Sequence, residues 1–167
     1  ISAGGCPIIV AALDDKLVFA HAGRDCVLDR TYIESDGSRK GREHESVVDS
    51  VCAALEATSS SVRYARVHVL GSIRPEHFMH PFGHSKHGDY NAHLYRFLKR
   101  YYPDCYQYEK VTAIGPDLPR IIRQQFVDRG VLESQVRLED AYLPEGLSAR
   151  FQGGNADRYL TVVVRRT

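Results

Sequence analysis

The stretch from Gly4 to Gly23, GGCPIIVAALDDKLVFAHAG, decides the fold. Its two apolar runs, residues 7–13 and 16–21, are separated only by Asp14 and Asp15. A short polar connector between two such runs predicts a hairpin of two buried strands. Cys6 precedes the first run and His21 closes the second, so a hairpin would bring a thiol and an imidazole side by side.

This pair of side chains could act as a nucleophile and its base, could bind zinc, or could have a structural role only. A thiol next to an imidazole can lose its proton and attack a substrate as a nucleophile, which makes Cys6 and His21 candidate catalytic residues. Gly5 leaves room for a substrate carbonyl and offers its N–H to an oxyanion, so we count it as substrate-binding. Thiolate and imidazole are also preferred ligands of zinc, which makes the same two residues candidate metal ligands. Otherwise Cys6 is a small buried residue and His21 a satisfied hydrogen-bonding group, with no cofactor.

The rest of the chain predicts an α/β (α+β) fold. Apolar residues at helical spacing predict helices at 43–58 and 91–102 and a third one from the N-cap Asp117 to Gly130. Alternating β-branched segments predict strands at 62–70, 108–114, 135–138, 147–151 and 159–165, and residues 24–41 are expected to form a loop. With no internal repeat and no linker, we expect residues 1–167 to form a single-domain layered sandwich with a mixed sheet packed by about three helices.

Composition restricts the possible partners. The chain has 167 residues, 43% of them apolar, and a net charge of +1, which suits one domain with a proper core. That balance leaves no electrostatic footprint for nucleic acid or an anionic membrane, so neither is expected as a partner. The four cysteines contain no CxxC pair, which favours free thiols and a cytoplasmic location. The first residue is Ile1 and not Met, which indicates that upstream residues are missing.

Two further groups of residues are candidates for a site. The loop at 74–87 begins with Arg74 and carries His77, His80, His84 and His87. These histidines could gather around a metal, but we favour a solvated loop that lines a pocket mouth, with Arg74 contacting the substrate. Near the C-terminus, paired strand ends bring together Ser148, Arg150 and Arg158, whose guanidinium groups suit a phosphate or carboxylate unless they simply lie on a surface hairpin.

The order of these motifs resembles that of the laccase-domain family, also called multicopper polyphenol oxidase-like proteins. The family has a cysteine before a strand, a His-Ala-Gly after the next strand, a Leu-Gly-Pro-x-Ile-x-Pro segment, an Asp-Leu helix and a Ser-Tyr-Arg hairpin. The counterparts in this chain are Cys6-Pro7, His21-Ala22-Gly23, the segment 70–75, Asp117-Leu118 and Ser148-Ala149-Arg150. The chain departs from the family in having Gly4-Gly5 before Cys6 and Arg24 in place of a tryptophan.

The resemblance implies a purine nucleoside-processing enzyme that works by phosphorolysis or deamination. Cys6 and His21 would then hold zinc or line the nucleoside pocket, and Arg150 or Arg158 would meet phosphate. The family's further histidine ligand lies well upstream of the cysteine, in a segment that would precede Ile1. A three-ligand zinc site would therefore need a loop histidine or an absent segment.

The start of the chain also resembles the catalytic core of the cytotoxic necrotizing factor toxins, which belong to the same superfamily. The resemblance rests on Cys6 and His21, fifteen positions apart, and on the small residues 2–5 before the cysteine. It implies a secreted effector that deamidates a glutamine of a target protein, with Cys6 as nucleophile and His21 as base. A third hypothesis is a non-catalytic binding module built on the same fold.

Overall fold

The computed structural model describes residues 2–3, 5–41, 45–57, 61–139, 141–143 and 159–160. Its α-helices are α1 (Arg24–Val27), α2 (Val47–Glu56), α3 (Gly88–Tyr101) and α4 (Leu118–Asp128), with 3-10 turns η1 (Arg30–Tyr32), η2 (Val62–Tyr64), η3 (Pro75–His77) and η4 (Glu133–Gln135). Its strands are β1 (Ser2–Ala3), β2 (Ile8–Leu13), β3 (Lys16–His21), β4 (Arg66–Leu70), β5 (His80–Pro81), β6 (Tyr106–Glu109), β7 (Ala113–Pro116), β8 (Val136–Arg137) and β9 (Tyr159–Leu160).

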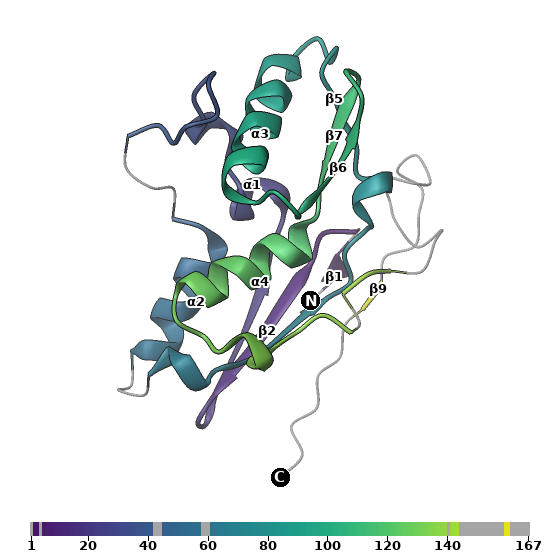
Figure 1. Cartoon of the computed structure of the whole chain (residues 1–167). Helices are drawn as coiled ribbons and strands as arrows, with labels where there is room; N and C mark the ends of the chain where they lie inside the picture. The colour runs from purple at the N-terminus through teal and green to yellow at the C-terminus, as the bar shows by residue number, and fades with distance from the viewer. Residues whose placement is uncertain are drawn as a thin grey trace.

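The central sheet has the strand order β3-β2-β4-β8 and is mixed, as predicted (Figure 1). β2 runs antiparallel to both β3 and β4, and β4 runs parallel to β8. The predicted hairpin is confirmed, with Leu13 paired with Lys16 across a two-residue connector. Asp14 in that connector has a φ of 54°, a left-handed conformation that aspartate tolerates better than most residues.

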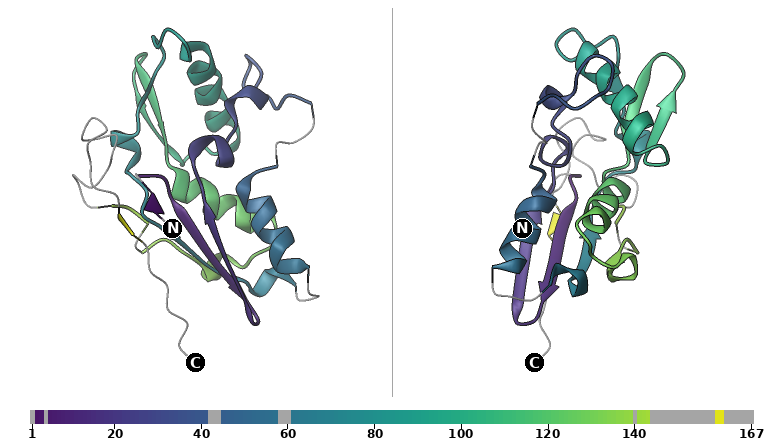
Figure 2. Two further views of the ribbon diagram at one scale, coloured as in Figure 1. Left: turned by 180° about the vertical axis from the view of Figure 1, so that it is seen from behind. Right: turned by 60° about the vertical axis from the view of Figure 1, so that its left-hand side comes forward.

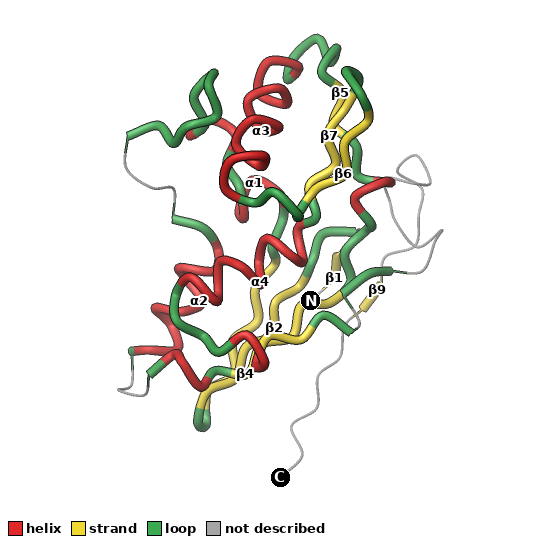
Figure 3. The backbone as a smooth tube through the Cα atoms, in the orientation of Figure 1, coloured by secondary structure: helices red, strands yellow, loops and turns green. Residues whose placement is uncertain are grey.

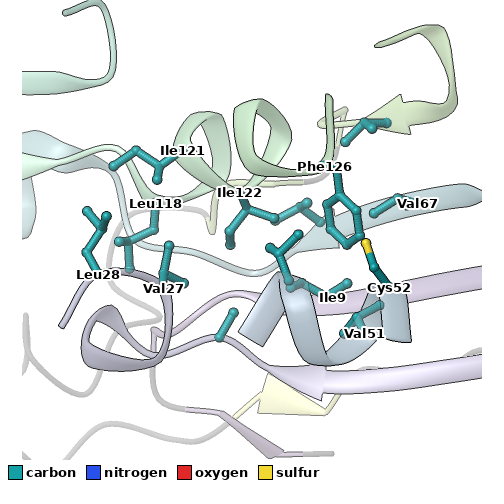
Figure 4. Close-up of a cluster of buried hydrophobic side chains, with 14 of the residues drawn as sticks. Ile9, Val27, Leu28, Val51, Cys52, Val67, Leu118, Ile121, Ile122 and Phe126 are labelled. Carbon is teal, nitrogen blue, oxygen red and sulfur yellow. The ribbon is translucent and has the colours of Figure 1, made fainter. Parts of the chain in front are cut away.

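Two of the helices predicted from their apolar stripes, α2 and α4, pack on the sheet and cover the same face (Figures 1 and 4). The capping box of Ser46 and Asp49 starts α2, and Asp117 caps α4. Phe126 of α4 is fully buried against Cys52 of α2 and the strands β2 and β4. Strand alternation sends every second side chain of β2, Ile9 among them, into this core.

A second sheet with the order β5-β7-β6 packs against α3, above the central sheet in Figure 3. The single strand predicted at 108–114 is therefore wrong. The chain instead turns at Val111, whose φ of 56° is rare for a β-branched residue and gives no sequence signal. The loop predicted at 24–41 contains α1 and η1, which are too short to show a helical period.

The opposite face of the central sheet is seen from behind in Figure 2, where β2 and β3 cross in front of α4. It carries the buried Ile8 and Val10, with the partly buried Leu70 packed against them and the half-exposed Leu17 and Phe19 nearby. The strand predicted at 147–151 lies outside the described residues, and β9 is the described part of the strand predicted at 159–165. None of the described helices has the length and apolar character needed to cross a bilayer.

Candidate active site

The hairpin brings Cys6 and His21 to the same side of the sheet. Ile8 pairs with His21, and the Ala22 N–H donates to the Pro7 carbonyl at 2.8 Å, so the pairing continues beyond β2 and places Cys6 opposite Gly23. Directly paired residues of an antiparallel ladder point to one face. The sulfur and the imidazole therefore share the face that α2 and α4 do not cover.

The space between the two side chains exists because residue 23 is glycine. A Cβ at Gly23 would lie 3.3 Å from Cε1 and 3.9 Å from Nδ1 of His21, and 3.9 Å from Sγ of Cys6. Both reactive groups thus lie within 4 Å of one point that no side chain occupies. His21 is exposed and Cys6 is half-buried, so this cradle is open to solvent on the imidazole side.

The same end of the sheet carries Gly5 and Arg74. Gly5 has a φ of 107°, a conformation that favours glycine, and its carbonyl accepts a hydrogen bond of 3.1 Å from the Ile73 N–H. That bond joins the residue before Cys6 to the residue before Arg74. This backbone bond brings the segment that starts the histidine loop next to Gly5.

Arg74 is held by an aromatic ring. Its guanidinium carbon lies 5.2 Å from the centroid of Tyr142, a cation–π contact, and the side chain is exposed. The Tyr142 hydroxyl donates to the Asp117 carboxylate, at 2.8 and 2.9 Å from its two oxygens. Burial and this hydrogen bond raise the pKa of Tyr142 well above its usual value, so the ring stays neutral. The cation–π contact holds the Arg74 guanidinium against the Tyr142 ring, and its exposed N–H groups can meet an anion.

A polar network adjoins this site, and sequence analysis missed it. Arg24 follows Gly23 and donates from Nε (2.9 Å) and Nη2 (2.7 Å) to the two oxygens of Asp25, while its Nη1 lies 3.2 Å from Nδ1 of the buried His80. Arg30, which is 8% exposed, donates to Oδ1 of Asn91 at 2.6 Å. The sequence marks Arg24 only as a departure from a tryptophan, and the pairing of residues 30 and 91 has no sequence signal because 61 positions separate them.

Among the described residues, no group of three or more histidine, cysteine or acidic side chains converges as a metal site. Cys6 and His21 are donors of the types that zinc prefers, and both lie within 4 Å of the position that a Cβ of residue 23 would take. They fit as two ligands of a zinc ion. Ser148, Arg150 and Arg158 lie outside the described residues, so their predicted roles stay predictions.

Comparison with known proteins finds similar folds but no similar sequences. No protein-family model matches the sequence, and no curated protein matches it. Among solved structures, YlmD from Geobacillus stearothermophilus superposes with a TM-score of 0.62 at 16% identity, covering 94% of this chain and 53% of that chain. The hypothetical protein YfiH from Bacillus licheniformis gives a TM-score of 0.60 at 13% identity with the same coverage.

This chain therefore spans about half the length of the solved structures it matches. At identities of 13% and 16%, this likeness shows that the chain shares a fold with YfiH and YlmD.

Proposed function

We propose that this protein is a purine nucleoside-processing enzyme, and specifically a phosphorylase, whose site lies at the cradle between Cys6, His21 and Gly23. The observation that carries the proposal is the convergence of the sulfur and the imidazole within 4 Å of one unoccupied point. The fold shared with YfiH and YlmD adds support by analogy only.

For phosphorolysis the protein must supply a proton donor for the leaving base, a group that binds phosphate, and space for the substrate. A phosphate oxygen attacks C1′ of the ribose, the C1′–N9 bond breaks, and its electron pair leaves with the base, which takes up a proton. His21 is exposed and placed to donate that proton or a hydrogen bond to the leaving purine. Arg74, fixed on the Tyr142 ring, has the planar N–H fork that binds a phosphate. Gly5 keeps the floor of the site free of side-chain bulk.

In a zinc-dependent form of the enzyme, the ion would lie at the same cradle. Cys6 and His21 would hold the ion, and a third ligand would have to come from residues outside the described ranges. When bound, zinc would polarise an oxygen of water or substrate. In that arrangement Arg74 would still bind and orient the phosphate.

The test is an assay of the purified chain with inosine or adenosine and phosphate, with added zinc and with a chelator. We expect release of free base and ribose 1-phosphate, with His21→Asn lowering kcat/KM by about 100-fold or more. Cys26→Ser, which changes an exposed thiol, is the matched control for Cys6→Ser. Base release in neither metal condition, with folded protein, would overturn the proposal.

A second candidate is a cysteine amidohydrolase acting on a protein glutamine. The observation that favours it is the thiol next to an imidazole, preceded by Gly5 in a conformation with φ of 107°. The Cys6 sulfur would attack the amide carbon, and its proton would pass through His21 to the leaving ammonia. Water would then hydrolyse the thioester and restore the thiol.

Mass spectrometry separates the two functions. Deamidation adds about 1 Da to the target protein and consumes no phosphate. Under this alternative, Cys6→Ser abolishes the mass gain whether or not zinc or chelator is present. A mass gain that Cys6→Ser leaves intact would exclude Cys6 as the nucleophile.

A further inference from the structure

A cluster of basic side chains lies where α1 and η1 meet the loop before α3. Arg24 and Arg30 come from the first two elements, and His84, Lys86 and His87 come from the loop. Arg30 is the anchor, because it is more than nine-tenths buried and its Nη1 is held by Asn91 of α3. The cluster belongs to neither of the functions proposed above.

Carboxylates in the described chain do not saturate this cluster. Both carboxylate oxygens of Asp25 accept hydrogen bonds from Arg24, and its Oδ1 also lies 3.6 Å from Nε of Arg30. Asp29 accepts instead from the backbone N–H and the hydroxyl of Thr31, at 2.8 and 2.7 Å. Asp89 is exposed in the first turn of α3. Two guanidinium groups therefore share one exposed carboxylate at their centre.

Arg30 keeps unused hydrogen-bonding capacity despite its burial. A guanidinium has five N–H donors, and among the described residues Arg30 uses one of them on Asn91 at 2.6 Å and directs Nε towards Asp25 at 3.6 Å. None of the guanidinium nitrogens of Arg30 is both inaccessible to solvent and without a hydrogen-bond partner. The remaining donors consequently reach solvent, where a small anion can meet them.

Positive charge reaches the loop from Arg24, Arg30 and Lys86. The pKa of His87 lies below its ordinary value, first through loss of hydration and then through the charges of Arg30, His84, Lys86 and Arg24. His87 and His84 stack with ring centroids 5.1 Å apart. α3 begins at Gly88 without a side-chain cap bond at its N-cap, so the positive end of its dipole adds to these charges.

We propose that Arg24, Arg30 and the loop of His84, Lys86 and His87 bind a phosphate-class dianion. The oxygens of the anion would accept hydrogen bonds from the remaining N–H groups of the two arginines on one side, and from Lys86 and the imidazole N–H groups of the loop on the other. The ligand is either inorganic phosphate or the phosphoryl group of a nucleotide, since both present the same oxygens.

The histidine rings give a local readout. Titrating the protein with inorganic phosphate at constant pH and ionic strength is expected to move the Cε1–H proton NMR signal of His87 in a saturable way. That signal is assigned with His87→Gln. Arg24→Gln should weaken the apparent affinity about tenfold, the effect of one charge-assisted hydrogen bond. Asp25→Asn should strengthen it, because it removes the competing carboxylate.

Controls separate this site from the proposed active site. Arg66→Gln removes an exposed positive charge on β4, and Arg74→Gln removes the arginine at the cradle; both should leave the His87 titration unchanged. Comparing adenosine 5′-monophosphate with inorganic phosphate distinguishes the sources, and adenosine, which has no phosphoryl group, is the negative control. Tighter binding of the nucleotide than of inorganic phosphate assigns a phosphorylated nucleoside, and equal or weaker binding assigns free phosphate.

An absence of saturable change up to about 20 mM phosphate, well above a millimolar Kd, would overturn the inference. So would an Asp25→Asn protein that binds phosphate no better than the wild type. The measurement needs no turnover, so failure of the phosphorolysis assay leaves it standing.

Discussion

At the scale of single residues, Gly23 controls access to the reactive pair. Its φ of −62° and ψ of 158° suit any residue, so the backbone does not require glycine at this position. What requires it is the space between the Cys6 sulfur and the His21 ring. A methyl group at this position would enter the cradle without changing the course of the chain.

Gly23→Ala is therefore expected to separate activity from stability. The free energy of unfolding should change by less than about 1 kcal/mol, while kcat/KM for the nucleoside should fall about 100-fold, because the methyl group displaces the reacting atoms. Urea unfolding and steady-state kinetics check the two parts. Gly83→Ala is the control, since no atom lies within 4 Å of its added Cβ. Unchanged kinetics in Gly23→Ala would show that substrate does not use this space.

The four free thiols should differ in reactivity. Burial, with smaller effects from neighbouring carboxylates, raises the pKa of both Cys52 and Cys105 to about 11. Only about one thousandth of each would be thiolate at pH 8. We expect iodoacetamide to modify the exposed Cys26 and the half-buried Cys6 first, as followed by peptide mass spectrometry. Denaturation in urea should abolish the difference. Labelling of Cys52 as fast as Cys26 in the native protein would contradict the burial.

The pairing of Cys6 with His21 could be predicted because it depends only on local features, namely two apolar runs and a two-residue connector. The arginine network could not be predicted in the same way. Arg24 meets His80 across 56 positions and Arg30 meets Asn91 across 61. Contacts of this range arise from how elements pack, and no spacing within one element encodes them.

At the scale of elements, α2 depends on its first turn. The Ser46 N–H donates to the Asp49 carboxylate at 2.7 Å, and the Ser46 hydroxyl accepts from the Asp49 N–H at 3.4 Å. Asp49 also forms an ion pair with Arg129 beyond the end of α4, so the same carboxylate links two helices. The helix start and the contact between helices are thereby stabilised together.

Ser46→Ala should lower the free energy of unfolding by about 1 kcal/mol, the usual effect of losing an N-cap. The midpoint of urea unfolding measures this. Ser50→Ala, an exposed serine within the same helix, is the control and should leave the midpoint nearly unchanged. Equal midpoints for the two variants would mean that the capping box contributes nothing.

The longer helices could be predicted because each shows several turns of apolar residues at helical spacing. The boundary between β6 and β7 could not, because Val111 makes the turn with a left-handed φ and no glycine, asparagine or proline marks it. Element length and turn chemistry thus decided what could be predicted at this scale.

At the scale of the whole molecule, one core joins α2 and α4 to the central sheet (Figure 4). Phe126 is among its largest fully buried side chains. Phe126→Ala should lower the free energy of unfolding by about 3–5 kcal/mol, through lost burial and the cavity left behind. Phe19→Ala, on the opposite face and 41% exposed, should cost less than about 1 kcal/mol. Thermal unfolding by circular dichroism compares them, and similar losses would contradict the placement of the core.

The mixed α+β architecture could be predicted from the order of elements, but the division of strands among sheets could not. β5, β6 and β7 pair with one another and not with the central sheet. Strand order is a property of the folded chain, set by which faces the helices cover.

The connector at Asp14 and Asp15 lies at the opposite end of the hairpin from the sulfur and the imidazole, and its length does not decide whether they meet. Hairpin loops of two to five residues can close the same ladder, so the register must be fixed elsewhere. It is fixed by burial, because Val18 and Ala20 of β3 pack against the core on one face of the sheet. An inserted residue would therefore bulge out at the connector and leave Ile8 opposite His21. The same burial that stabilises the hairpin thus keeps the imidazole beside the sulfur, and the loop is free to change in length.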